Sequence, residues 1–183
     1  MNWKFIQDEM IRHVRQGKGR EAREDLTGEH PLGDAGQAIL FLIFAAAWTL
    51  DSFGVRCTTL NKYLPPGFRI ILSLSLIALS GLLVVKGVST VFGETRKTPA
   101  VIRTGVFSCV RHPIYLGEIL FCAGLLALSF SIAAFTIWVL LIGFLHFISR
   151  HEEKLLINRF GDEYRAYMRE VGMWFPKRPK LRS

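Results

Sequence analysis

The stretch PIYLGEILFCAGLLALSFSIAAFTIWVLLIGFLHFIS, residues 113–149, decides the fold class of this chain. Its 37 residues include one charged side chain, that of Glu118. One straight helix of that length would be roughly 55 Å long, whereas the hydrocarbon core of a bilayer is roughly 30 Å thick. We therefore expect the chain to fold back near residues 129–131 and to form a tight hairpin of two membrane spans.

Two other apolar stretches precede this hairpin and are separated by a turn at residues 64–67 (LPPG). Residues 35–55 carry Asp51 as their one charged side chain, and residues 68–85 carry Arg69. Half of the chain is hydrophobic and 21% is charged, so the apolar excess is segregated into these stretches. The sequence predicts an all-α fold: a polytopic membrane helical bundle of about four transmembrane helices, followed by a cytosolic C-terminal helical segment.

Residues 1–34 form a separate, polar segment. Apolar side chains recur in it at helical spacing, at Trp3, Ile6, Met10 and Val14. This pattern predicts an amphipathic helix, which either lies in the membrane interface or covers the cytosolic face. A stretch rich in glycine and proline, which runs to Gly36, predicts a linker. We therefore divide the chain into residues 1–34 and an integral-membrane domain of residues 35–183.

The distribution of basic residues predicts the orientation in the membrane. The chain has 23 Lys and Arg against 15 acidic residues, a balance that suits either nucleic acid or an anionic membrane surface. The hydropathy favours the membrane, and no nucleic-acid partner is expected. Four spans place 19 of the 23 basic residues on the side that holds both termini. The positive-inside rule then predicts cytoplasmic termini.

Several common sites are not expected from the sequence. Cys57, Cys109 and Cys122 form no CxxC pair, and His146 and His151 are not at the spacing that aligns two ligands on one helix face. A metal site is therefore not predicted. The sequence also lacks the GxGxxG, Walker A, HExxH and GxSxG motifs, so a nucleotide-like cofactor would bind without a Rossmann sheet.

The first candidate motif is Arg111-His112-Pro113-Ile114-Tyr115. Pro113 suits the first position of a helix, where its missing N–H costs nothing, so His112 is expected at or just before the helix start. Free backbone N–H groups and the positive end of the helix dipole there suit a carboxylate or another anion. The alternative is an interfacial anchor, in which Arg111 and His112 meet lipid head groups and Tyr115 joins an aromatic belt.

The second candidate motif is Arg150-His151-Glu152-Glu153, at the end of the fourth predicted span. Two adjacent acids directly below a membrane span are unexpected, because that zone favours Lys and Arg. A carboxylate there suits the two hydroxyls of a ribose. The alternative is a solvated acidic pair balanced by basic neighbours on the same helix.

The polar tail that follows predicts one more helix. Gly161 is expected to end the preceding helix, and Asp162 to be the N-cap of a short last helix. That helix would carry an apolar stripe that either lies over the site or packs at the interface, formed by Tyr164, Tyr167, Met168 and Val171.

Together the two motifs form one ordered pattern. It begins Gly105-x-Phe107-x3-Arg111-His112-Pro113-x-Tyr115 and, after about 35 residues, continues as Glu152-Glu153-x2-Leu156-x3-Phe160-Gly161-x2-Tyr164-x2-Tyr167. The pattern resembles the isoprenylcysteine carboxyl methyltransferase family, which belongs with the small integral-membrane phospholipid methyltransferases. The resemblance covers roughly residues 68–176.

This resemblance implies a membrane-embedded methyltransferase that uses S-adenosyl-L-methionine, with a cofactor-binding part at about residues 93–176. Glu153 would hold the ribose of the cofactor. The other cofactor-binding residues that the resemblance and the acidic pair predict are Val101, Ile102, Phe107, His112, Pro113, Ile114, Tyr115 and Glu152.

By the same resemblance, Arg150 would act in catalysis by orienting the methyl-accepting group. A guanidinium can hold a carboxylate bidentately, which suits a lipophilic carboxylate acceptor, such as a prenylcysteine-like or other lipid, that enters from the bilayer. The alternatives are an amine or a thiol acceptor, which would need deprotonation. The tail reads Arg169-Glu170-Val171-Gly172 where isoprenylcysteine enzymes tend toward Arg-Val-Pro. This departure weakens the case for a prenylcysteine substrate in particular.

Two other functions remain as alternatives. Membrane sterol reductases, which use NADPH, show a similar Arg-His-Pro-x-Tyr run and a later acidic helix, although their second motif differs. A non-enzymatic lipid-binding scaffold would leave the two motifs on one face of the membrane unexplained.

Overall fold

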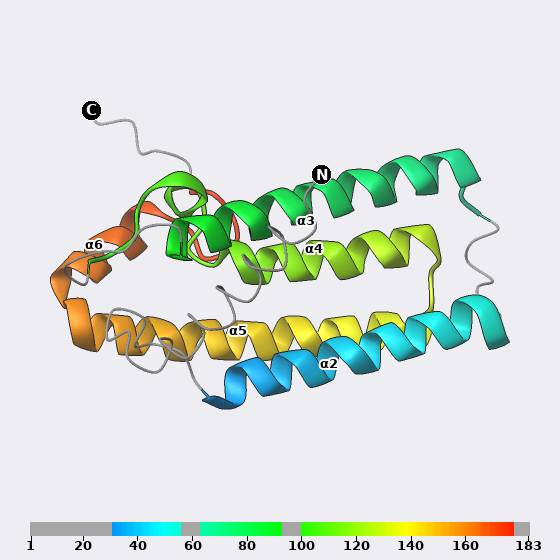
Figure 1. Ribbon diagram of the computed structural model, residues 1–183, viewed down its shortest axis with the longest axis horizontal. Helices are drawn as coiled ribbons and strands as arrows, with labels where there is room; N and C mark the ends of the chain where they lie inside the picture. Colours follow the sequence, from blue (N-terminus) through cyan, green and yellow to red (C-terminus); the bar gives the residue numbers. More distant parts are fainter. Residues whose placement is uncertain (1–30, 56–62, 93–99, 178–183) are drawn as a thin grey trace, which may run out of the picture.

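The structure is a computed structural model that describes residues 31–55, 63–92 and 100–177 (Figure 1). The predicted amphipathic helix of residues 3–14 lies outside these ranges. The described residues form helices joined by turns, without a strand. In chain order the elements are α2 (Pro31–Thr49), the π-helical η3 (Leu50–Val55), α3 (Pro66–Phe92), the 3-10 helix η5 (Gly105–Ser108), α4 (Pro113–Leu128), α5 (Ile132–Phe160) and α6 (Asp162–Glu170).

The helices are long and apolar enough for a membrane bundle. Three stretches reach spanning length, at Ala35–Phe53, Pro66–Val91 and Ile132–Phe160, and α4 is a shorter apolar helix of 16 residues. Figure 1 shows α2, α3, α4 and α5 side by side, with α6 across one end. The predicted all-α polytopic bundle is confirmed. At 16 residues, α4 extends only roughly 24 Å, less than the hydrocarbon thickness.

Two helix boundaries differ from those predicted. Helix α2 begins at Pro31 rather than at Ala35, so the predicted linker is shorter at this end. Helix α3 begins at Pro66 and continues to Phe92, past the predicted end at Val85. Proline at a helix start is not a breaker, because its missing N–H would have no partner there.

The hairpin at residues 129–131 is confirmed, although it contains neither glycine nor proline. The indole Nε1 of Trp48 in α2 donates to the carbonyl oxygens of Leu125 at 2.9 Å and Ser129 at 3.0 Å. Arg69, at the start of α3, donates to the carbonyl oxygen of Leu128. Side chains from two other helices therefore bond carbonyls at the end of α4, where the carbonyl of Leu125 also accepts the backbone N–H of Ser129 at 3.0 Å.

Side chains also make hydrogen bonds to the start of α5. The hydroxyl of Ser131 accepts a hydrogen bond from the backbone N–H of Ala134 at 3.0 Å, as an N-cap does. The same hydroxyl donates to the carboxylate of Asp51, and the hydroxyl of Ser52 lies 2.9 Å from that of Ser129. The π-helical turn η3 thus places its polar side chains against the hairpin, which explains the acid in the first predicted span.

Small residues bring α3 and α4 into close contact. A Cβ atom at Gly117 would lie 2.6 Å from Cγ2 of Val84 and 3.2 Å from the carbonyl oxygen of Ser80. A Cβ atom at Gly124, two turns further along α4, would lie 3.2 Å from the carbonyl oxygen of Ser73. The two backbones approach as closely as small-residue motifs permit in membrane helices.

Helix α2 packs against α5 on the other side of the bundle. A Cβ atom at Gly36 would lie 2.5 Å from Cζ of Phe144, so this glycine is a packing position in α2 and not part of a linker. The core between these helices contains Phe44, Leu141 and Leu145, which are fully buried. This packing fixes α5, the helix that carries the predicted acidic pair.

The α3–α4 contact predicts different effects for two alanine substitutions. Gly117→Ala should lower the thermal unfolding midpoint in detergent, because the new methyl group overlaps Val84 and lies against backbone. Gly143→Ala is the matched control, since a Cβ atom there meets nothing within 4 Å. The control should keep or raise the midpoint, because alanine is favoured over glycine by about 1 kcal/mol in a helix. Equal midpoints for the two variants would contradict the close approach.

Candidate functional site

The candidate site lies where α4 begins. His112 is the N-cap of α4 and Pro113 is in its first turn, as predicted. The backbone N–H of Arg111 donates to the carbonyl of Gly172 at 2.9 Å, and that of His112 donates to the carbonyl of Met173 at 3.2 Å. The C-terminal segment, residues 171–177, therefore lies against the start of α4. Its carbonyls accept hydrogen bonds from two N–H groups that could otherwise have faced an anion.

A buried ion pair joins α4 to α5 at this point. Nε and Nη2 of Arg111 lie 2.8 Å and 2.7 Å from the same oxygen, Oε1 of Glu153. The side chains are 7% and 2% exposed. Nη1 of Arg111 donates to the carbonyl oxygens of Val171 at 2.6 Å and Met168 at 3.1 Å. One guanidinium thus holds α5, the end of α6 and the C-terminal segment together.

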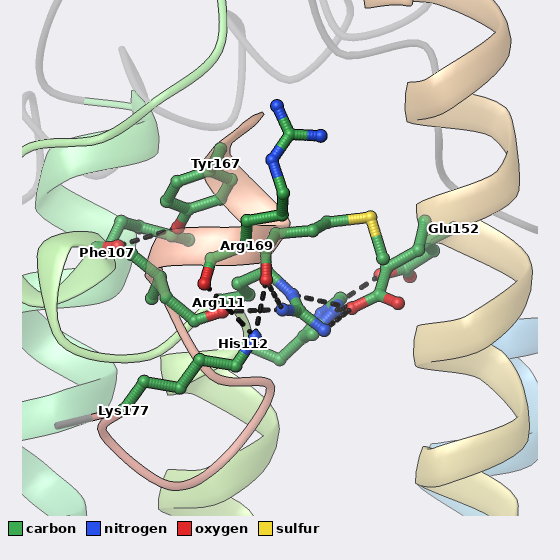
Figure 2. A network of polar contacts seen from close by, with 10 residues as sticks. Phe107, Arg111, His112, Glu152, Tyr167, Arg169 and Lys177 are labelled. Atoms are coloured by element: carbon green, nitrogen blue, oxygen red, sulfur yellow. Dashed lines mark hydrogen bonds and ion pairs between the residues drawn. The ribbon is translucent and has the colours of Figure 1, made fainter. Parts of the chain in front are cut away.

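Sequence reasoning did not assign this pairing role to Arg111. Its partner Glu153 lies 42 positions away in the sequence, and the alternative considered for the arginine was a lipid head group. The signal that could have found the pair is charge: two adjacent acids below a membrane span need a cation, and Arg111 belongs to the other motif. Figure 2 shows Arg111 and His112 pointing toward the acidic side chains of α5.

His112 and Tyr115 complete the contact between the two motifs. Nε2 of His112 lies 3.3 Å from Oε1 of Glu153, and its Nδ1 lies 3.6 Å from Oε2 of Glu152. The ring of Tyr115 stacks on the imidazole, with centroids 5.7 Å apart and planes 5° apart, and its hydroxyl donates to Glu152. The structure therefore brings four of the predicted site residues into one cluster.

Helix α6 packs at the same end of the bundle as this cluster. Tyr167 is buried, and its hydroxyl donates to the carbonyl oxygen of Phe107 at 2.6 Å. Burial raises the pKa of Tyr167 to about 12, so the phenol stays protonated and remains a donor at neutral pH. Val101 packs against Tyr164 and Tyr167, while Ile102 is half-buried beside it in the chain. The predicted apolar stripe of α6 packs on the loop that carries the first motif.

The turn before α6 differs from its prediction by one residue. Gly161 ends α5 as predicted, with a positive φ of +56° that favours glycine. The same residue is also the N-cap of α6, so Asp162 is the first residue of that helix rather than its cap. Its carboxylate accepts from Arg165 at 2.8 Å instead. Because this one residue joins the two helices, it is the C-cap of α5 and the N-cap of α6 at once.

The C-terminal segment is also fixed to α6. The ammonium of Lys177 donates to the carbonyl oxygen of Met168 at 2.7 Å (Figure 2). The carbonyl that Arg111 contacts from one side is thus also contacted by Lys177. Carbonyls at the C-terminal end of a helix attract cations, because the helix dipole is negative there.

Two predicted site residues lie apart from the cluster. Ile114 contacts α3 at Gly87 and lines a groove of about 410 Å³ between α2, α3 and α4, together with Glu118. Arg150 is on α5 one turn before Glu153, and its side chain is exposed. No hydrogen bond or ion pair joins Arg150 to another of the residues that the structure describes. Its predicted contact with an acceptor remains a prediction.

Comparison with known proteins agrees with these motifs. Residues 67–163, more than half of the chain, match the family model described as phospholipid methyltransferase. The chain belongs to the phospholipid methyltransferase family. The matched region contains the α4 motif and the acidic pair, and membership of this family implies S-adenosyl-L-methionine as the cofactor.

A curated relative supports the family resemblance. Over 81 residues the chain is 38% identical to the protein-S-isoprenylcysteine O-methyltransferase of Saccharomyces cerevisiae (strain ATCC 204508 / S288c). The alignment covers 42% of this chain and 32% of the yeast protein, so the chain matches about a third of that relative's length.

The buried ion pair predicts a large loss on truncation. Arg111→Met leaves the carboxylate of Glu153 buried without its cation, which typically costs about 3–5 kcal/mol. We expect a strongly lowered free energy of unfolding in detergent and faster amide exchange in residues 164–173. The control is Arg165→Met, whose pair with Asp162 is exposed and should contribute about 0–1 kcal/mol. Similar losses for the two variants would show that the Arg111 pair does not organise the site.

Proposed function

We propose that this chain is a membrane-embedded methyltransferase that uses S-adenosyl-L-methionine and acts on a lipophilic acceptor. The observation that supports this most is the cluster of Arg111, His112, Glu152 and Glu153. It joins two motifs from distant parts of the sequence at one end of the bundle, inside the region matched by the family model.

The residues present fit the polar part of the cofactor. Oε1 of Glu153 is held by Arg111, whereas its Oε2 is buried and has no hydrogen-bond partner among the described residues. A carboxylate oxygen in that state is an acceptor for the hydroxyls of a ribose. The residues proposed to line the rest of the site are Val101, Ile102, Phe107, His112, Pro113, Ile114, Tyr115 and Glu152.

The proposed reaction depends mainly on how the protein positions the cofactor and the acceptor. When bound, the cofactor supplies a methyl group on a sulfonium, which is transferred by in-line displacement to the acceptor, with S-adenosylhomocysteine as the product. Glu153, fixed by Arg111, would hold the ribose. His112 and Tyr115, which stack on each other and contact Glu152, would form a rigid wall beside it. Helix α6 and the C-terminal segment would exclude water from this end.

The proposed acceptor reaches the site from the bilayer. Large apolar side chains are exposed on the outer faces of the helices, and a lipophilic molecule could approach between them. A carboxylate acceptor is already ionised at neutral pH and needs no general base. Arg150 is proposed to hold that carboxylate. We place both termini, and therefore the entry of the soluble cofactor, on the cytoplasmic side, because that side holds 19 of the 23 basic residues.

The cofactor assignment predicts the binding behaviour of two variants. Glu153→Gln should weaken binding of S-adenosylhomocysteine by about 1–3 kcal/mol, the usual loss for a hydrogen bond to a charged group. His112→Ala should change the affinity in the same direction. Calorimetry on protein in detergent measures both, with NADPH as the comparison ligand that a reductase would bind. Normal affinity of both variants, with unchanged unfolding midpoints, would refute the assignment.

The acceptor assignment predicts a separation of binding from turnover. Arg150→Lys keeps the positive charge but loses the bidentate fork, so affinity for S-adenosylhomocysteine should be unchanged while turnover falls steeply. Turnover is measured on membranes supplied with labelled cofactor and a prenylcysteine analogue. A simple positive-inside anchor would accept lysine without loss. Full turnover by Arg150→Lys would therefore show that Arg150 is not part of the site, and the argument for a carboxylate acceptor would fail with it.

A further inference from the structure

One face of α5 carries three polar residues that lead toward the candidate site. His146, Ser149 and Glu153 are three and four positions apart, so their side chains lie along one face of the helix. The ring of Trp174, from the C-terminal segment, packs edge-on against His146 with centroids 5.6 Å apart. Ser149 thus lies between the residue that contacts the C-terminal segment and the residue that contacts Arg111.

The hydroxyl of Ser149 is unusual among those of the described helices. The residue is fully buried, and its Oγ has no hydrogen-bond partner in the described part of the chain. Four other hydroxyls on these helices donate to the carbonyl four residues earlier: those of Thr49, Ser75, Thr90 and Thr136. A buried hydroxyl without such a bond is rare in native proteins and calls for a ligand or another explanation.

Two more buried polar atoms near Ser149 have no hydrogen-bond partner among the residues that the structure describes. They are Oε2 of Glu153, one turn further along α5, and Nε1 of Trp174. Glu153 already uses its other oxygen for Arg111 and His112, so its free oxygen has a fixed orientation. Side chains four positions apart on a helix have Cβ atoms about 5–6 Å apart, close enough to contact one small polar group from two directions.

We propose that Ser149 is a cofactor-binding residue that shares the ribose hydroxyls with Glu153. One ribose hydroxyl donates to Oε2 of Glu153, which can only accept. The neighbouring ribose oxygen exchanges a hydrogen bond with the hydroxyl of Ser149, which can donate as well as accept. This assignment rests on the proposed function and extends it from a single carboxylate to a two-point contact.

The assignment is tested by binding, without turnover. The ligands are S-adenosylhomocysteine and its 2′-deoxy and 3′-deoxy forms, titrated by calorimetry into wild-type protein and Ser149→Ala in detergent. We expect Ser149→Ala to bind S-adenosylhomocysteine about tenfold more weakly than wild type. We also expect wild type and variant to bind one of the two deoxy ligands equally, because that ligand lacks the oxygen that Ser149 contacts.

Controls separate a ligand contact from a packing effect. Ser73→Ala removes another buried hydroxyl, on α3 against Gly124, and should leave the affinity unchanged. An equal loss by Ser149→Ala for all three ligands would indicate general disturbance and overturn the assignment, as would unchanged affinity for S-adenosylhomocysteine. If wild-type protein bound none of the three, the proposed function itself would fail. Wild-type discrimination among the ligands needs no variant, so it tests the ribose contact even if Ser149→Ala does not fold.

Discussion

The buried pair of Arg111 and Glu153 is the interaction on which the arrangement of this end of the bundle depends. Burying two charges is expensive, and only complete hydrogen bonding makes it tolerable. The guanidinium meets this demand with one carboxylate oxygen and the carbonyls of Met168 and Val171. Its five donors in a rigid plane suit three partners at once, which lysine could not match. The pair thus fixes where α4, α5 and the C-terminal segment meet, whatever it contributes to net stability.

Much of the frame around this pair could be predicted from the sequence. Hydropathy and bilayer thickness predicted the spans and the hairpin, because both constraints act on composition and length alone. Pro113 predicted the start of α4, and Gly161 the end of α5, because their backbone preferences are local. The pattern of the two motifs alone indicates the family. Each of these inferences used information that lies within a few residues or one helix.

The remaining features depend on contacts between distant residues. No property of residues 129–131 shows that Trp48 and Arg69 satisfy the carbonyls around that turn. Gly36 was predicted to lie in a linker because glycine breaks isolated helices, but contact with Phe144 makes it a packing residue. The choice of Glu153 as the partner of Arg111 likewise arises from the packing of α4 and α5. Local sequence shows which residues are unusual and leaves their partners open.

The two arginines near Glu153, Arg111 and Arg150, differ in whether their hydrogen-bond donors are already used inside the protein. Arg111 is buried, and its donors are used inside the protein, so it cannot also hold an acceptor without releasing Glu153 or the C-terminal segment. Arg150 lies one turn from the same glutamate, is exposed, and makes no hydrogen bond to the described residues. An arginine that recognises a transient partner must keep its donors available, and Arg150 meets that condition where Arg111 does not. The proposed division follows: Arg111 fixes the carboxylate that would bind the ribose, and Arg150 is left for the acceptor.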